Sequence, residues 1–145
     1  MLYLGADHRG FQHKQEVKEL LERLGVDFED VGGVEYAPED DYPDVAARVA
    51  GAVSKNPDRD KGVLICGSGI GTDIVANKFP GVRSAAVFSV DAARSSRLDN
   101  DANVLSLSAD HLTKDGTFEI VRAWLGTSFS GEARHARRLA KIRQI

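Results

Sequence analysis

The sequence predicts an α/β fold in which a five-stranded parallel sheet is covered by helices on both faces. Five short apolar runs alternate along the 145 residues with segments of helical periodicity. The connections are short, and strand–helix–strand order of this kind gives right-handed crossovers and parallel strands. No internal repeat, low-complexity stretch or linker divides the chain. We therefore expect a single domain over residues 1–145.

The first strands flank a long amphipathic helix. Residues 2–6 form a short apolar run of the kind found in a buried strand. Apolar side chains recur at helical spacing over residues 11–24, and Gly25 stands where a helix commonly ends. Residues 26–31 alternate apolar and acidic side chains, which predicts the second strand.

The middle of the chain is predicted to form a helix, then a strand, and then a second helix after a glycine-rich stretch. Residues 34–41 are a polar loop, and the next helix opens at Tyr42-Pro43 because proline is favoured in a first helical turn. Residues 63–65 are a continuous apolar run and predict the third strand. The segment after the glycines, residues 74–78, is predicted as a helix.

The C-terminal part continues the alternation. Strands are predicted at residues 84–88 and 104–107, and helices at residues 91–98, about 112–125 and 132–145. The last helix is strongly basic.

The totals exclude several classes of protein. A formal net charge of −3 gives no sign of nucleic-acid binding, and a single cysteine excludes an internal disulfide. The four histidines are scattered without a metal-ligand spacing, so no metal site is expected. There is no signal-peptide pattern and no apolar run near the ~18 residues of a membrane span. We expect a cytoplasmic protein.

The lone cysteine, Cys66, follows the third apolar run and precedes a serine bracketed by glycines, Gly67-Ser68-Gly69-Ile70-Gly71. Glycines after a strand and before a helix let backbone N–H groups approach an anion, and the helix dipole adds to this. A thiolate here would be stabilised and could act as a base or a nucleophile. Ser68 and its neighbouring N–H groups could hold an oxyanion. The spacing is not the G-x-G-x-x-G fingerprint of dinucleotide sites.

Three polar segments are expected to meet at one edge of the sheet, since ligands bind beyond the carboxyl ends of parallel strands. They are residues 7–9, 66–71 and 99–103. In the last helix, Arg134 and Arg138 share a face at i, i+4 and could clamp one phosphate. Simpler interpretations stay open: a small buried cysteine, an ordinary tight turn and a solvated basic helix.

The chain resembles the ribose-5-phosphate isomerase B family, which includes the galactose-6-phosphate isomerase subunits. The resemblance extends over essentially the whole chain. It rests on Gly5-Ala-Asp-His-Arg-Gly10, Asp41-Tyr-Pro43, Ile65-Cys-Gly-Ser-Gly-Ile-Gly71, Ala76-Asn-Lys78, Asn100-Asp-Ala-Asn-Val104 and Arg134-His-Ala-Arg-Arg138. The resemblance implies a Rossmann-like α/β/α sandwich. It also implies a homodimer or homotetramer with an active site shared between subunits, in which the basic helix over residues 132–145 packs on a partner subunit. The implied reaction is aldose–ketose isomerisation of a sugar phosphate in the pentose phosphate pathway, with no cofactor.

The resemblance also implies a role for each matching residue. Cys66 would move a proton between C1 and C2 through an enediolate, and Asp7 would handle sugar hydroxyls. The enediolate oxygen would be held by Ser68 and by the backbone of Gly67, Gly69, Ile70 and Gly71. His8, Arg134 and Arg138 would bind the phosphate, and Tyr42 and Asn100 would line the pocket. A second branch of the family has glutamate at the position of Thr72 in place of the cysteine, so this chain follows the cysteine branch.

Two positions depart from the family pattern. Asp99 stands where many members carry the histidine assigned to ring opening, and as a catalytic residue in its place a carboxylate can still accept a proton. Asp110 stands at the position of an arginine that binds phosphate. We therefore keep related substrates open, namely a tetrose 4-phosphate, which cannot close a furanose ring, or a hexose 6-phosphate. Two other functions also stay open: a non-catalytic phosphosugar-binding protein, and a cysteine hydrolase with Cys66 as nucleophile.

Overall fold

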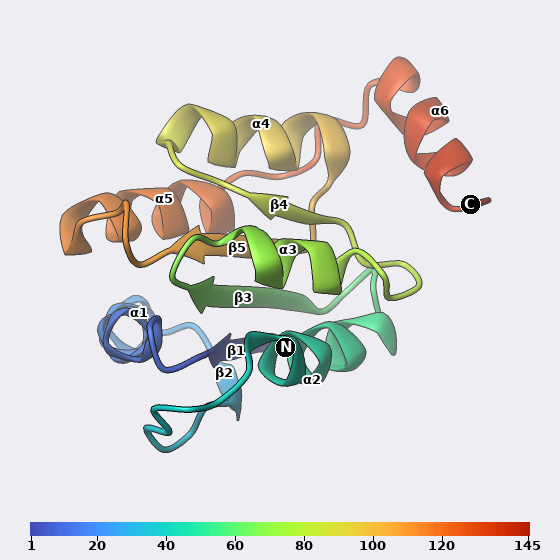
Figure 1. Cartoon of the computed structure of the whole chain (residues 1–145). Coiled ribbons are helices and arrows are strands. Elements are labelled where there is room, and N and C mark those ends of the chain that lie inside the picture. The colour runs from blue at the N-terminus through green and yellow to red at the C-terminus, as the bar shows by residue number, and fades with distance from the viewer.

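The computed structural model describes residues 1–145 as a three-layer α/β/α sandwich (Figure 1). Five parallel strands lie in the order β2-β1-β3-β5-β4. The strands are β1 (Leu2–Ala6), β2 (Phe28–Gly32), β3 (Lys61–Cys66), β4 (Ser84–Ala86) and β5 (Val104–Ser108). The helices are α1 (Phe11–Leu24), α2 (Tyr42–Ser54), α3 (Ile70–Ala76), α4 (Val90–Asn100), α5 (Lys114–Gly126) and α6 (Ala133–Ile142). The predicted fold class is confirmed.

Two apolar clusters hold the helices onto the sheet. Alternate strand residues point to opposite faces, so Val63 and Ile65 join one cluster and Leu64 joins the other. The first cluster contains side chains of α1, α4 and α5, with Trp124 fully buried in it. The second cluster contains side chains of α2 and α3. Strand β3 is therefore buried on both faces, as its uninterrupted apolar sequence predicts.

Most predicted elements are found within two residues of their expected bounds. The exception that matters for the site is α3, which was predicted from residue 74 and begins at Ile70. Gly69 adopts a left-handed conformation with φ of 75° and allows the chain to turn directly into the helix. Gly71 therefore lies in the first helical turn, and the loop between β3 and α3 consists only of residues 67–69.

The last helix is set apart from the other layers. Helix α6 packs on α4 and buries only His135 and Leu139 of its ten residues. Figure 1 shows it projecting away from the sheet, at the end opposite to the arrowheads of the strands. Its basic side chains Arg134, Arg137 and Arg138 are exposed. No helix of the structure combines the length and the apolar character that crossing a membrane requires.

Candidate active site

The Cys66 thiol lies at the carboxyl end of the central strand. Cys66 is the last residue of β3 and is 4% exposed. The backbone N–H of Gly69 donates to Cys66 Sγ over 3.1 Å. A Cβ atom at Gly69 would lie 2.9 Å from the carbonyl carbon of Leu107, so this position accepts only glycine. The tight turn therefore brings a backbone donor onto the sulfur.

Two buried hydroxyls stand beside the thiol. Thr72 Oγ1 lies 3.4 Å from Cys66 Sγ and 2.6 Å from Ser106 Oγ. The hydroxyl of Ser106 donates to the carbonyl of Gly69 over 2.7 Å. Neither Thr72 nor Ser106 was predicted as a site residue. The sequence signal was present, because Ser106 and Ser108 interrupt the otherwise apolar strand β5.

Ser68 lies at the mouth of the same turn. Its Oγ accepts a hydrogen bond from the backbone N–H of Ile70 over 3.2 Å. The hydroxyl proton of Ser68 is therefore free to be donated to a ligand oxygen. The ring of Tyr42, at the start of α2, packs on Gly71, where an added Cβ would lie 2.7 Å from the ring. Ser68, Tyr42 and the Cys66 loop thus lie together.

The end of β1 supplies Asp7 and His8. Asp7 is 5% exposed and accepts from the backbone N–H of Gly10 over 3.0 Å. Burial raises the pKa of Asp7, and the hydrogen bond from Gly10 opposes this shift. Asp40 Oδ1 lies 2.8 Å from His8 Nδ1 and also accepts from the backbone N–H of His8. This side-chain hydrogen bond raises the pKa of His8, so the imidazole keeps its positive charge to higher pH.

An arginine spans the carboxyl ends of three strands. Arg9 follows β1, and its guanidinium packs on Gly67 after β3, where an added Cβ would meet it at 2.8 Å. One guanidinium nitrogen then pairs with Asp110 Oδ2 after β5 at 2.6 Å. The backbone N–H of Asp110 donates to the carbonyl of Gly67. Asp110 is therefore paired with an arginine from another loop.

The predicted meeting of all three loops is wrong for residues 99–103. This segment precedes β5, and in a parallel sheet the residues before a strand lie at its amino end. Gly62 pairs with Val104, whereas Cys66 pairs with Ser108. The four-residue separation places the segment roughly 13 Å along the sheet from Cys66 at 3.3 Å per residue. Asp99 and Asn100 lie in the last turn of α4, outside the Cys66 site of their own chain.

The basic helix α6 lies with Asp99 and Asn100 at the amino end. His135 Nε2 of α6 lies 3.4 Å from Asp99 Oδ1. Arg143, just after the helix, pairs at 2.7 Å with Asp58, which precedes β3. The expected phosphate ligands Arg134 and Arg138 are thus not brought to Cys66 within one chain.

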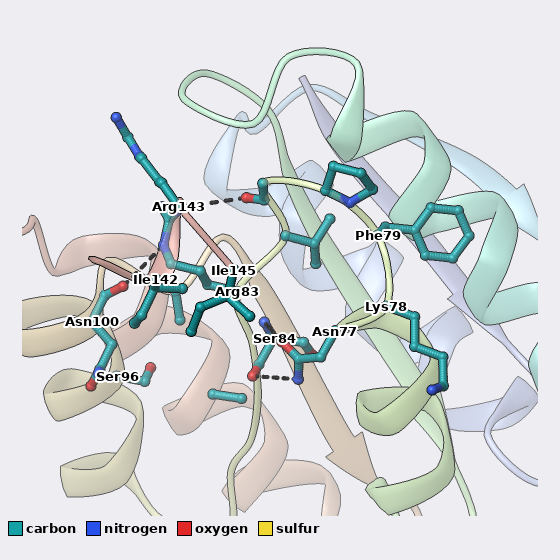
Figure 2. Close-up of a pocket in the computed structure, with 15 residues that line it drawn as sticks. Asn77, Lys78, Phe79, Arg83, Ser84, Ser96, Asn100, Ile142, Arg143 and Ile145 are labelled. Atoms are coloured by element: carbon teal, nitrogen blue, oxygen red, sulfur yellow. Dashed lines mark hydrogen bonds between the residues drawn. The ribbon is translucent and has the colours of Figure 1, made fainter. Parts of the chain in front are cut away.

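A cavity also opens at the amino end. It has a volume of about 630 Å³ and lies between the segment 77–85, the end of α4 and the C-terminal residues (Figure 2). Asn100 and Arg143 line it, and Figure 2 shows Asn77 hydrogen-bonded to the backbone of Ser84 along one wall. The predicted site residues therefore form two groups, one at each end of the sheet. No cluster of three or more His, Cys, Asp or Glu side chains has a metal-binding arrangement.

Comparison with known proteins assigns the chain to a family. The model for Ribose/Galactose Isomerase matches residues 2–142. Ribose-5-phosphate isomerase B of Escherichia coli is 39% identical over 141 residues, which cover 97% of this chain and 93% of that protein.

Two solved structures of the same family are closely similar to this chain. Ribose-5-phosphate isomerase B from Mycoplasma genitalium with bound ribulose-5-phosphate has a TM-score of 0.95 at 39% identity, covering 99% of this chain and 93% of that one. The type B enzyme of Trypanosoma brucei has a TM-score of 0.90 at 40% identity, covering 99% and 96%. The chain is a member of the ribose/galactose isomerase family.

Proposed function

We propose that this aldose–ketose sugar-phosphate isomerase interconverts ribose 5-phosphate and ribulose 5-phosphate, with Cys66 as the base. The observation that carries the proposal is the buried thiol at the end of β3, held by the N–H of Gly69 in a loop that matches the family. A thiol in this position can form a thiolate that removes a proton from carbon. The related structure that contains ribulose 5-phosphate supports this choice of substrate.

The reaction needs one proton moved between neighbouring carbons. The Cys66 thiolate removes the proton from C2 of the aldose, the C–H bonding electrons form the enediolate double bond, and the new S–H returns the proton to C1. The Ser68 hydroxyl, with the backbone of Gly67, Gly69, Ile70 and Gly71, stabilises the developing oxyanion. Asp7, whose pKa is raised by burial, handles the proton of a sugar hydroxyl.

The phosphate is bound where positive charge gathers. His8 carries a proton to higher pH because Asp40 accepts its hydrogen bond, and Arg9 covers the turn at Gly67. We propose that Arg134 and Arg138 complete this site from the α6 of a second copy. The supporting observation is their position on a projecting helix at the amino end, far from Cys66 of the same chain.

A shared active site accounts for the two groups of residues. Asp99 and Asn100 lie at the amino end with α6, whereas Cys66 and His8 lie at the carboxyl end. We therefore propose a homodimer, or a tetramer built from it, in which one copy presents α4 and α6 to the Cys66 loop of the other. The exposed side chains of Ile70 and Ile74, next to that loop, suit burial in such a contact.

A substrate panel and one variant test the proposed function. Ribose 5-phosphate, a tetrose 4-phosphate and a hexose 6-phosphate are compared by kcat/KM, and solvent hydrogen exchange into C1 or C2 is measured. Exchange that is lost in Cys66→Ala supports the isomerase. A tetrose phosphate turned over far better than ribose 5-phosphate would overturn ribose 5-phosphate as the substrate. A covalent acyl or phosphoryl adduct on Cys66 without exchange would instead identify a hydrolase.

A further inference from the structure

Three consecutive hydrogen-bond contacts lead away from the Cys66 sulfur into the protein. They join Cys66 Sγ to Thr72 Oγ1 at 3.4 Å, Thr72 Oγ1 to Ser106 Oγ at 2.6 Å, and Ser106 Oγ to the carbonyl of Gly69 at 2.7 Å. Thr72 is completely buried and Ser106 is 1% exposed. We call these four groups the hydroxyl chain. Because these hydroxyls are buried away from water, each hydroxyl proton must be donated to another group of the hydroxyl chain.

The far end of the hydroxyl chain fixes its direction. The carbonyl of Gly69 can only accept, so Ser106 donates to it. The proton of Ser106 is then used, so Thr72 must donate in the short contact with Ser106. Thr72 Oγ1 also lies 3.4 Å from the carbonyl of Gly69, a much longer contact. With the proton of Thr72 used as well, only an S–H on Cys66 can make the first contact.

The assignment of donors and acceptors changes when Cys66 is a thiolate. Three contacts then share two hydroxyl protons. The charged sulfur is the strongest acceptor, so Thr72 turns to donate to Sγ and Ser106 turns to donate to Thr72. The carbonyl of Gly69 loses the hydrogen bond from Ser106. The thiolate thus gains a charge-assisted hydrogen bond at the expense of a neutral one.

We propose that Thr72 and Ser106 are positioning residues that reverse the direction of the hydroxyl chain each time Cys66 gains or loses its proton. This inference rests on the proposed role of Cys66 as the base. During catalysis the substrate C–H bond breaks, the S–H bond forms, and the electron pair enters the enediolate. Asp7 handles the sugar hydroxyl proton, as above, and within the hydroxyl chain no O–H bond breaks, because the two hydroxyls only rotate. Thr72 therefore serves the base by holding it in both protonation states.

Charged groups around the thiol are separate from the hydroxyl chain. Those on the elements that surround it are Asp7 and His8 after β1, Arg9 over the turn, Asp110 and His111 after β5, and Asp73 on α3. Substituting Thr72 or Ser106 by an uncharged residue leaves all six in place. A change in the ionisation of the thiol can then be attributed to the hydroxyls.

The experiment measures the pH dependence of iodoacetamide alkylation in the native protein. Cys66 is the only cysteine, so the reaction reports this thiol alone. Thr72→Val removes the donor to the thiolate, and the midpoint of the alkylation profile should rise by about half to one pH unit. Ser106→Ala removes two hydrogen bonds from the thiol state but one from the thiolate state, so the midpoint should fall. Thr72→Ser keeps the hydroxyl and should restore the original midpoint.

A matched control and a second readout complete the test. Thr117→Val makes the same change at another buried threonine, on α5, whose hydroxyl has no partner, and it should not move the midpoint. Thiolate absorbance in the ultraviolet gives the same midpoint without access of a reagent, and the pH profile of kcat/KM should shift with it. Midpoints that move in the same direction in Thr72→Val and Ser106→Ala, or do not move, overturn the hydroxyl chain. An active Cys66→Ala variant would instead refute Cys66 as the base.

Discussion

At the scale of single residues, the charges around the candidate site are set by partners from distant segments. Asp40 lies in a polar loop with no motif, yet it bonds twice to His8. Arg9 and Asp110 are 101 positions apart and form an ion pair across the turn. The sequence predicts His8 and Asp7 because they follow a strand. It could not predict their partners, since long-range pairing depends on how loops fold over the sheet.

The partner of His8 gives a pH-dependent prediction. The hydrogen bond to Asp40 raises the pKa of His8, so the imidazole is charged below that pKa and loses its charge as the pH rises through it. KM for ribose 5-phosphate should therefore rise with pH, and Asp40→Asn should move this rise to lower pH. Steady-state kinetics across neutral pH measure it. Asp41→Asn, at the neighbouring acid, should leave the profile unchanged; equal shifts in both variants would contradict the assignment.

The Arg9 pair gives a prediction about substrate binding. Arg9→Ala leaves the Asp110 carboxylate without its partner beside the proposed phosphate site, and KM should increase roughly tenfold, as expected for losing a charge-assisted contact. Adding Asp110→Asn to Arg9→Ala should recover part of the loss, because the repulsive charge is removed. Arg48→Ala, an exposed arginine on α2, is the control. If the double variant is no better than Arg9→Ala, Asp110 does not face the phosphate.

At the scale of elements, the site depends on how the third strand turns into its helix. The apolar run and the glycines predict a strand, a turn and a helix in this order. They did not predict where α3 begins, because the left-handed conformation of Gly69 compresses the turn. That early start places Thr72 beside the sulfur. Helix onset after glycines depends on a single dihedral angle, which periodicity does not reveal.

The turn should therefore tolerate no side chain. Gly69→Ala combines positive φ with a Cβ atom 2.9 Å from the backbone of Leu107, and it should lower the free energy of unfolding by about 1–3 kcal/mol and abolish most activity. Denaturant unfolding and kinetics measure both effects. Gly126→Ala at the end of α5 has open space around its Cβ and should be neutral or slightly stabilising. A stable, fully active Gly69→Ala protein would show that the turn relaxes freely.

At the scale of the whole molecule, the family, the fold and the sheet were predicted correctly from sequence. The family membership inferred from motifs is confirmed by the family match over residues 2–142. The predicted location of residues 99–103 was wrong because these residues adjoin the amino end of β5 and not its carboxyl end. A sequence motif does not by itself reveal at which end of the sheet it lies, or which copy of the chain contributes it to a site.

A shared site can be tested by complementation. Cys66→Ala and the double variant Arg134→Ala/Arg138→Ala should each be nearly inactive alone. After the two are mixed, dissociated and reassociated, activity should return, because a mixed dimer contains one site without either defect. As the control, each variant is dissociated and reassociated alone. If activity does not return although mixed assemblies form, both groups of residues act within one chain.

The separation of Cys66 from α6 also affects how the enzyme responds to dilution. If one chain contains the base and another the phosphate ligands, a lone chain has no turnover, and activity per chain falls as the assembly dissociates. At low concentration the rate should then rise with the square of protein concentration. A newly synthesised chain would remain inactive until it met a second one, so the amount of enzyme would set a threshold for flux.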